Sequence, residues 1–155
     1  MRRNLRVAAY AVCVRDGQLL LARSPGPDGT PEWVLPGGGM DHGEDPYDTV
    51  RREVAEETGY RIRVTDLLGV DSLRVVGDPR VGRRRDHHAL RIVYAGEVVG
   101  GELRYEVGGS TDFAAWQDLD AVPGLNRVPL VDIALGLWRG RPPHGRPEPV
   151  PYPGR

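Results

Sequence analysis

The chain has 155 residues, which suits one domain, and 39% of them are hydrophobic, enough for one core. Its formal net charge is −1, so charge alone would not hold a nucleic-acid backbone. All 21 basic residues are arginine, which excludes a lysine-containing phosphate-binding loop and Schiff-base catalysis. The single cysteine, Cys13, excludes an internal disulfide and a zinc site built from several thiolates.

No apolar run reaches the roughly 18 residues that a membrane span needs. The start of the chain also lacks the apolar segment and cleavage site of a signal peptide. We therefore expect a cytoplasmic protein without a membrane partner.

Apolar runs separated by turn residues predict a series of strands. The strands are expected at residues 5–14, 18–22, 33–35, 61–76, 87–99, 102–107 and 114–117. Asp16-Gly17 makes the first two a hairpin, and a loop rich in proline and glycine follows over 24–31. Cys13 lies within the first strand and is expected to be a buried small residue.

A helix is predicted between Asp45 and Gly59. Asp45 suits the N-cap, a proline follows at the first helical position, and Gly59 suits the position after the last turn. Tyr47, Val50 and Val54 recur at helical spacing, so we expect this stripe to face the core.

Apolar side chains at helical spacing predict a second helix over 128–138. The final segment, 139–155, holds six prolines, three glycines and four arginines. Such a composition buries too little apolar surface to offset the entropy of ordering. We therefore predict a domain at 1–138 followed by a flexible tail at 139–155.

The residues suited to chemistry are concentrated in the first helix. On an ideal helix Glu53, Glu56 and Glu57 fall within an arc of roughly 100°, beside the apolar stripe. Their mutual repulsion is increased by the negative end of the helix dipole. A hard cation such as Mg²⁺ or Mn²⁺ would relieve it, because such ions take carboxylate oxygens. On charge alone, a solvated acidic face in which Arg52 pairs with Glu56 is the favoured explanation, and a metal site is the minority one.

The glycines Gly37, Gly38 and Gly39 precede this acidic segment. Bare backbone lets a ligand approach closely and offers a carbonyl oxygen to a metal ion. An ordinary turn is the alternative interpretation of the same three residues.

The acidic segment resembles the signature of the Nudix hydrolases, GX5EX7REUXEEXGU. The matching residues are Gly38, Glu44, Arg52, Glu53, Val54, Glu56, Glu57 and Gly59, with Tyr60 where an aliphatic residue is usual. A looser likeness spans most of residues 5–138, including the segment 33–37 and the strand around Trp116.

The resemblance implies an α/β fold, an α/β/α sandwich with a mixed sheet, in which the signature forms a loop–helix–loop. It also implies metal-dependent hydrolysis of a pyrophosphate bond in a nucleotide or a nucleoside-diphosphate-linked compound. ADP-ribose and nucleoside triphosphates are examples of such substrates. The alternative function is a module of the same fold that binds a nucleotide without cleaving it.

By position, the resemblance makes Glu53, Glu56 and Glu57 ligands of Mg²⁺ or Mn²⁺. A backbone carbonyl of Gly37 or Gly38 would complete the ligand set.

The expected catalytic residues are Glu53, Glu56 and Arg52, one glutamate orienting or deprotonating the attacking water. Arg52 would hold the carboxylates in place by charge-assisted hydrogen bonds. Glu44 would brace the loop through backbone N–H groups or a metal-bound water.

Substrate contacts are expected at Gly38 and Gly39 and at residues outside the signature. Arg23 either binds phosphate or is a surface arginine, and Trp33 either stacks on a base or packs against the core. Glu106 and Asp112 flank a glycine loop, and each either reaches the site or is a solvated acid.

The remaining features indicate few partners besides a small-molecule nucleotide. His87 and His88 follow each other in a strand and so face opposite ways, which favours structural roles. The run 83–85 of three arginines is best explained as a solvated loop, so a nucleic-acid partner is not expected. Homodimerisation is left open by the sequence.

Overall fold

The structure is a computed structural model that describes residues 2–77, 85–104 and 108–149. Its strands are β1 (Arg2–Arg15), β2 (Gln18–Pro25), β3 (Pro31–Val34), β4 (Gly37–Gly39), β5 (Tyr60–Val76), β6 (Arg85–Gly101) and β7 (Phe113–Asp118). Its helices are α1 (Pro46–Thr58), α2 (Pro129–Gly140) and the short 3-10 helix η2 (Leu119–Gly124).

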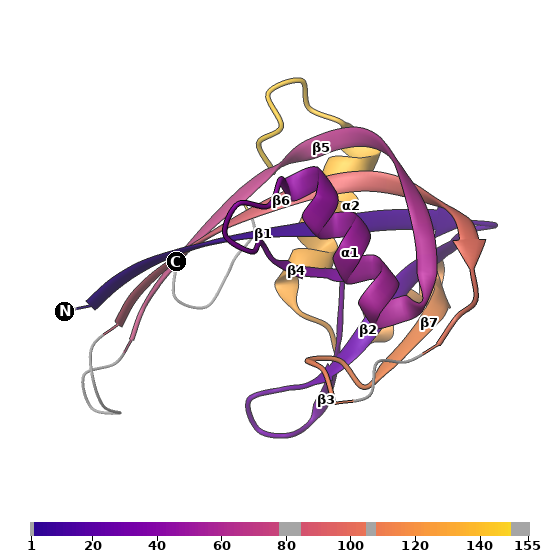
Figure 1. The fold of residues 1–155 in the computed structure, drawn as a ribbon, viewed down its shortest axis with the longest axis horizontal. Helices are drawn as coiled ribbons and strands as arrows, with labels where there is room; N and C mark the ends of the chain where they lie inside the picture. The colour runs from indigo at the N-terminus through magenta and orange to yellow at the C-terminus, as the bar shows by residue number, and fades with distance from the viewer. Residues whose placement is uncertain (1, 78–84, 105–107, 150–155) are drawn as a thin grey trace.

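The strands form one mixed sheet in the order β3-β2-β1-β6-β5, with β4 paired to β1 and β7 paired to β2. Strands β1 and β6 run parallel, and the other neighbours run antiparallel. In Figure 1, α1 lies in front of the strands and α2 lies behind them. The expected α/β/α sandwich with a mixed sheet is therefore confirmed.

Two apolar clusters pack on the two faces of the sheet because successive strand residues point to opposite sides. Val12 of β1 packs with α2, whereas Ala11 and Cys13 pack with Val50 and Val54 of α1. Cys13 is 1% exposed, as expected, and its burial raises the pKa of the thiol to about 12.

Helix α1 begins and ends at the residues that the sequence indicated. The Asp45 side chain accepts a hydrogen bond from the Tyr47 N–H at 2.8 Å. Gly59 ends the helix in the left-handed conformation, with φ 79°. The predicted core stripe is correct for Val50 and Val54 but wrong for Tyr47, which is exposed and makes an edge-to-face ring contact with Tyr94.

The other differences lie at strand and helix ends. The strand expected at 102–107 is absent over 102–104, where the Arg104 N–H bonds to the carbonyl at the end of α1 instead of a sheet partner. Helix α2 continues to Gly140, and the Gly145 carbonyl accepts a hydrogen bond from the Val70 N–H at 2.8 Å. The division into a domain and a flexible tail stays a prediction, although the segment up to Gly145 contacts β5. No helix in the described chain is long and apolar enough to cross a membrane.

Candidate active site

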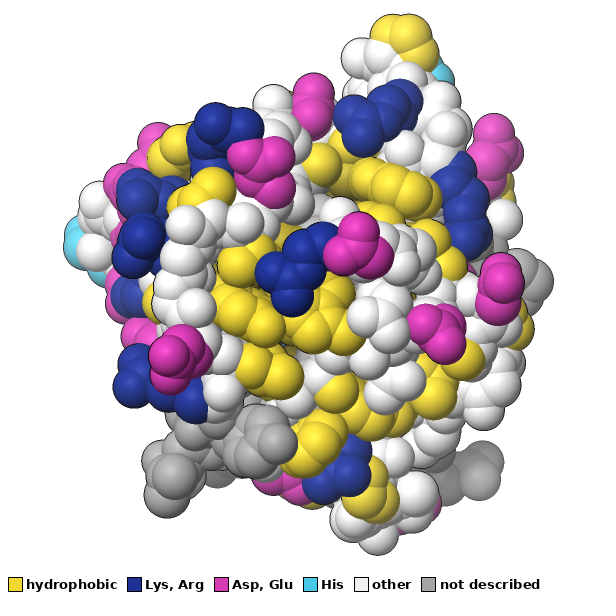
Figure 2. All heavy atoms as spheres, turned by 90° about the vertical axis from the view of Figure 1, so that its right-hand side faces the viewer, with side chains coloured by type: hydrophobic (Ala, Val, Ile, Leu, Met, Phe, Trp, Pro, Cys, Tyr) yellow, Lys and Arg dark blue, Asp and Glu magenta, His cyan; other side chains and the backbone are white. Residues whose placement is uncertain are grey.

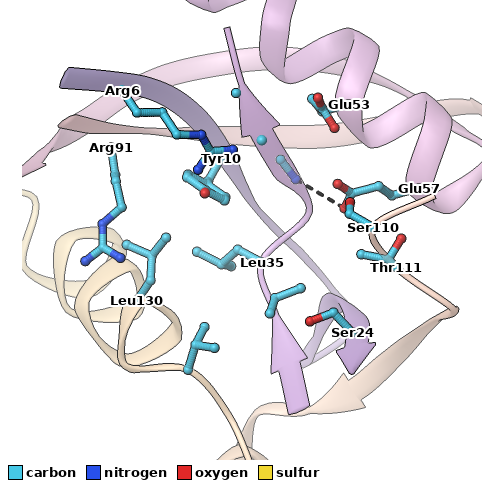
Figure 3. A pocket seen from close by; sticks show the side chains of 15 residues that line it. Arg6, Tyr10, Ser24, Leu35, Glu53, Glu57, Arg91, Ser110, Thr111 and Leu130 are labelled. Atoms are coloured by element: carbon cyan, nitrogen blue, oxygen red, sulfur yellow. Dashed lines mark hydrogen bonds between the residues drawn. The ribbon is translucent and has the colours of Figure 1, made fainter. Parts of the chain in front are cut away.

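Helix α1 places two of its three glutamates at a cavity. Because Val50 and Val54 pack against the sheet, Glu57, one turn after Val54 and two turns after Val50, is buried, at 2% exposed. Glu53 lies one turn earlier than Glu57, and its side chain is 15% exposed. Both carboxylates face a cavity of about 340 Å³ beside β4 (Figure 3).

The backbone of β4 forms the floor of this cavity between the acids and the sheet. A Cβ atom on Gly38 would lie 2.8 Å from the carboxylate carbon of Glu53. The Gly37 N–H donates to Glu57 Oε2 at 3.4 Å, and a Cβ on Gly37 would lie 2.3 Å from the Ala9 carbonyl oxygen. Position 37 therefore requires glycine, whereas a side chain at position 38 would displace the Glu53 carboxylate. The three glycines form a strand instead of an ordinary turn.

Arg52 joins the loop before α1 to the acids on the helix. Its guanidinium donates to Glu44 at 2.8 Å, to Glu53 at 3.0 Å and to Glu56 at 3.3 Å. It also donates to the Gly39 carbonyl at 3.2 Å, which ties the helix to β4. The holding contacts expected of Arg52 are thus present.

Glu44 braces the loop as expected, because its carboxylate accepts a hydrogen bond from the Asp41 N–H at 3.2 Å. The hydrogen bonds from Arg52, followed by the one from the Thr49 hydroxyl, lower the pKa of Glu44 to about 2. The same contact with Glu44 raises the pKa of Arg52 above its usual value. Both side chains therefore remain charged at neutral pH.

The third glutamate, Glu56, is oriented differently from the other two. It is exposed, pairs with Arg52, and does not line the cavity. Within the described residues, no three Asp, Glu, His or Cys side chains are grouped closely enough to hold a metal ion. The oxygen donors of Glu53, Glu57 and the β4 carbonyls nevertheless suit a hard cation such as Mg²⁺ or Mn²⁺. The metal-ligand roles of these residues stay predictions.

The NUDIX domain family model matches residues 3–134. The chain belongs to the Nudix family. It is 34% identical over 119 residues to the ADP-ribose pyrophosphatase of Methanocaldococcus jannaschii, a match that spans 77% of this chain and 65% of that protein. It is 30% identical over 139 residues to the RNA pyrophosphohydrolase of Acidiphilium cryptum, spanning 80% of this chain and 79% of that protein.

Solved structures agree with this family. A MutT NUDIX hydrolase from Burkholderia pseudomallei is similar at a TM-score of 0.68 and 32% identity, covering 85% of this chain and 96% of that one. A NUDIX hydrolase from Nitrosomonas europaea shares the fold at a TM-score of 0.73 and 23% identity, covering 98% and 100%. The Nudix fold and family of the domain are therefore supported by both comparisons.

Three residues of the Nudix domain that were expected to contact substrate lie outside the cavity lining. Arg23 pairs with Asp112 at 3.2 Å, and its guanidinium lies 4.9 Å from the centre of the Phe113 ring. Trp33 turns toward the same ring and packs against the core on the α2 side. Glu106 lies outside the described residues. The substrate roles of all four stay predictions, whereas Gly38 and Gly39 do line the cavity.

Several residues that line the cavity were not predicted from the sequence, among them Arg6, Tyr10, Arg91 and Thr111. The signal for Arg91 was a charge at a core-facing position of an apolar strand, between Leu90 and Ile92. Thr111 gave no such signal. Its hydroxyl is buried and has no hydrogen-bond partner among the described residues, which is costly unless a ligand or water supplies one.

The histidines form structural contacts. His87 contacts the Asn4 side chain at 2.8 Å, and His88 contacts the Ser72 hydroxyl at 2.7 Å. Arg83 and Arg84 of the expected arginine loop lie outside the described residues. On the face of Figure 2, basic and acidic side chains of the described residues are interspersed among apolar ones. That view therefore gives no support for a nucleic-acid surface.

Proposed function

We propose that this Nudix domain hydrolyses a pyrophosphate bond in a nucleotide or a nucleoside-diphosphate-linked compound, with Mg²⁺ or Mn²⁺ as cofactor, in the cytoplasm. One observation carries the proposal: Glu53 and Glu57, one helical turn apart, line the same cavity as the bare backbone of β4. A diphosphate could lie against this backbone because Gly38 and Gly39 have no side chains in the way.

In this proposal the carboxylates of Glu53 and Glu57 and a carbonyl of Gly37 or Gly38 would hold the cation. The cation would supply positive charge that neutralises the diphosphate oxygens. Glu56 would join the ligand set if it turned away from Arg52. Such a rotation is feasible because Glu56 is exposed.

A glutamate of the Nudix signature, Glu53 or Glu56, would accept the proton from the attacking water. Arg52 acts as a positioning residue, because it bonds to both carboxylates as well as to the Gly39 carbonyl. The Thr111 hydroxyl would donate a hydrogen bond to a phosphate oxygen, which would satisfy its unpartnered hydroxyl.

The relatives support the substrate class. The names ADP-ribose pyrophosphatase and RNA pyrophosphohydrolase both describe cleavage of pyrophosphate bonds in nucleotide compounds. The two names differ in the rest of the substrate. They therefore support a pyrophosphate bond as the bond that is cleaved, but they do not identify the group attached to it.

The test is hydrolysis of a nucleotide panel with Mg²⁺ or Mn²⁺ by the wild type and by Glu53→Gln, Glu56→Gln and Glu57→Gln. We expect each loss to lower the rate by about 100-fold or more, the contribution of one general base or ligand. Asp48→Asn is the matched control, because Asp48 is an exposed acid on the same helix. It should retain the wild-type rate.

Direct titration of Mn²⁺ gives a second measurement that does not depend on turnover. Binding should weaken in Glu53→Gln and Glu57→Gln and remain unchanged in Asp48→Asn. Equal turnover by the wild type and all three glutamate variants would contradict the site. A nucleotide that stabilises the protein against heat yet stays intact would favour a binding module instead.

A further inference from the structure

Two arginines form the wall of the cavity on the side away from the glutamates. Arg6 lies on β1 and Arg91 on β6, and both line the cavity. In the parallel pairing of these strands, Ala8 is opposite Arg91 and Ala89 is opposite Arg6. Register partners face the same side of a sheet, so the arginines are diagonal neighbours on one face. We call this pair the arginine wall.

The cavity exists at this point because the residues between the arginines are small. Ala8 and Ala89 are buried and fill little space. Tyr10 and Leu130 close the sides of the hollow, and Figure 3 shows the two arginines on the left of the cavity, opposite Glu53 and Glu57.

Arg91 is fixed in its position by a buried ion pair. Its Nε donates to Asp71 Oδ2 at 2.9 Å, and its Nη2 contacts the same oxygen. The two side chains are 10% and 2% exposed. Removing such a pair from water is costly, and apolar residues of similar size often stabilise a fold equally well. The guanidinium at the cavity wall is therefore better explained by binding than by stability.

Arg6 has a different environment. It forms no ion pair with any residue in the described ranges. A Cβ on Gly39 would lie 3.1 Å from Arg6 Nη2, so the guanidinium rests against the bare backbone of β4. Its charge is available to an anion in the cavity.

The two charge types thus meet at successive residues of one strand. Gly38 lies against the Glu53 carboxylate and Gly39 lies against the Arg6 guanidinium. A linear anion across β4 would pass from the acidic side, which the proposed cation occupies, directly to the arginine wall. Guanidinium groups match phosphate oxygens in geometry and charge.

We propose that the arginine wall binds a phosphate next to the diphosphate that is cleaved. This inference rests on the proposed function. The substrate class would then be nucleotides with a chain of at least three phosphates. Diphosphates joined to an uncharged sugar would lack this contact, since a sugar offers no anionic group to Arg6 or Arg91.

The experiment compares kcat/KM for a nucleoside triphosphate with kcat/KM for a nucleoside diphosphate–hexose that carries the same base. Arg6→Gln should lower the value for the triphosphate by about 10- to 100-fold, the worth of a hydrogen bond to a charged group. The value for the sugar compound should be unchanged. Arg2→Gln, an exposed arginine of the same strand outside the cavity, is the matched control and should change neither.

Arg91 requires a paired variant, because Arg91→Gln alone would leave Asp71 as a buried uncompensated charge. The double variant Arg91→Gln with Asp71→Asn removes both charges and should show the same selective loss for the triphosphate.

Titration with inorganic tripolyphosphate and pyrophosphate in the presence of Mg²⁺ separates this inference from the proposed function. The wild type should bind tripolyphosphate more tightly than pyrophosphate, and Arg6→Gln should lose that preference. If no nucleotide is cleaved, the proposed function is wrong. The titration still tests whether the arginine wall binds a third phosphate, because it measures binding and not cleavage. An equal loss for both substrates or an unchanged tripolyphosphate affinity in Arg6→Gln would overturn the inference.

Discussion

Substitution of Gly38 by alanine should damage the site more than the fold. The added Cβ would lie 2.8 Å from the carboxylate carbon of Glu53 and 2.9 Å from each of its oxygens. Reaching ordinary contact would displace this carboxylate by roughly half an ångström, away from β4 and against Arg52. Misplacement on the scale of 1 Å costs about 100-fold in rate, so Gly38→Ala should lose about 10- to 100-fold.

The stability of Gly38→Ala should change by about 1 kcal/mol or less. Only the end of a flexible side chain must move, and alanine in extended backbone gains about 0.4–1 kcal/mol by restricting the unfolded chain. Gly37→Ala is the contrasting variant. Its Cβ would meet the Ala9 carbonyl at 2.3 Å, and φ is +149°. Backbone strain and overpacking should together cost about 2–6 kcal/mol.

Urea unfolding and initial-rate hydrolysis on the same preparations measure both effects. Gly38→Ala should unfold near the wild-type midpoint yet hydrolyse slowly, whereas Gly37→Ala should unfold at a much lower urea concentration. A fully active Gly38→Ala would refute the placement of Glu53 at the reacting group, and a wild-type midpoint for Gly37→Ala would refute the close approach of β4 to β1.

Two further predictions concern charged groups. The pKa of Glu44 lies at about 2, below its usual 4.5, so the ionised carboxylate stabilises the fold above about pH 4.5 and this contribution disappears as the pH falls toward 2. The unfolding midpoint of wild type should exceed that of Glu44→Gln at pH 6 and converge with it near pH 2; a constant difference would contradict the assignment. Asp71→Ala should lower the free energy of unfolding in urea by about 3–5 kcal/mol, because it removes the buried carboxylate that pairs with Arg91. The double variant Asp71→Leu with Arg91→Met should unfold near the wild-type midpoint. Equal losses in these two variants would contradict that explanation.

The first helix and its acids could be predicted because their signals are local. Capping by Asp45 and Gly59 depends on residues within one turn, and the spacing of Val50 and Val54 sets which side of the helix faces the sheet. The burial of Glu57 beside that stripe follows from the same angles. Tyr47 broke the pattern because it lies in the first helical turn, where exposure is possible whatever the spacing.

The opposite wall of the cavity could not be predicted in the same way. Arg6 and Arg91 are 85 residues apart in sequence, and only the parallel register of β1 and β6 makes them neighbours. The orientation of Glu56 toward Arg52 and the pairing of Arg23 with Asp112 depend on side-chain partners that sequence spacing does not specify.

The sequence by itself determined the helix that carries the acids, the glycines before it, and the absence of lysine chemistry and of an internal disulfide. These properties arise from residue types and from spacing over one or two helical turns. The tertiary structure decided which acids face the cavity, why a side chain at Gly37 would clash with β1 and one at Gly38 would displace Glu53, and which arginines lie opposite. Those features depend on strand pairing across long sequence separations, and pairing energy is spread over many contacts that no local pattern encodes.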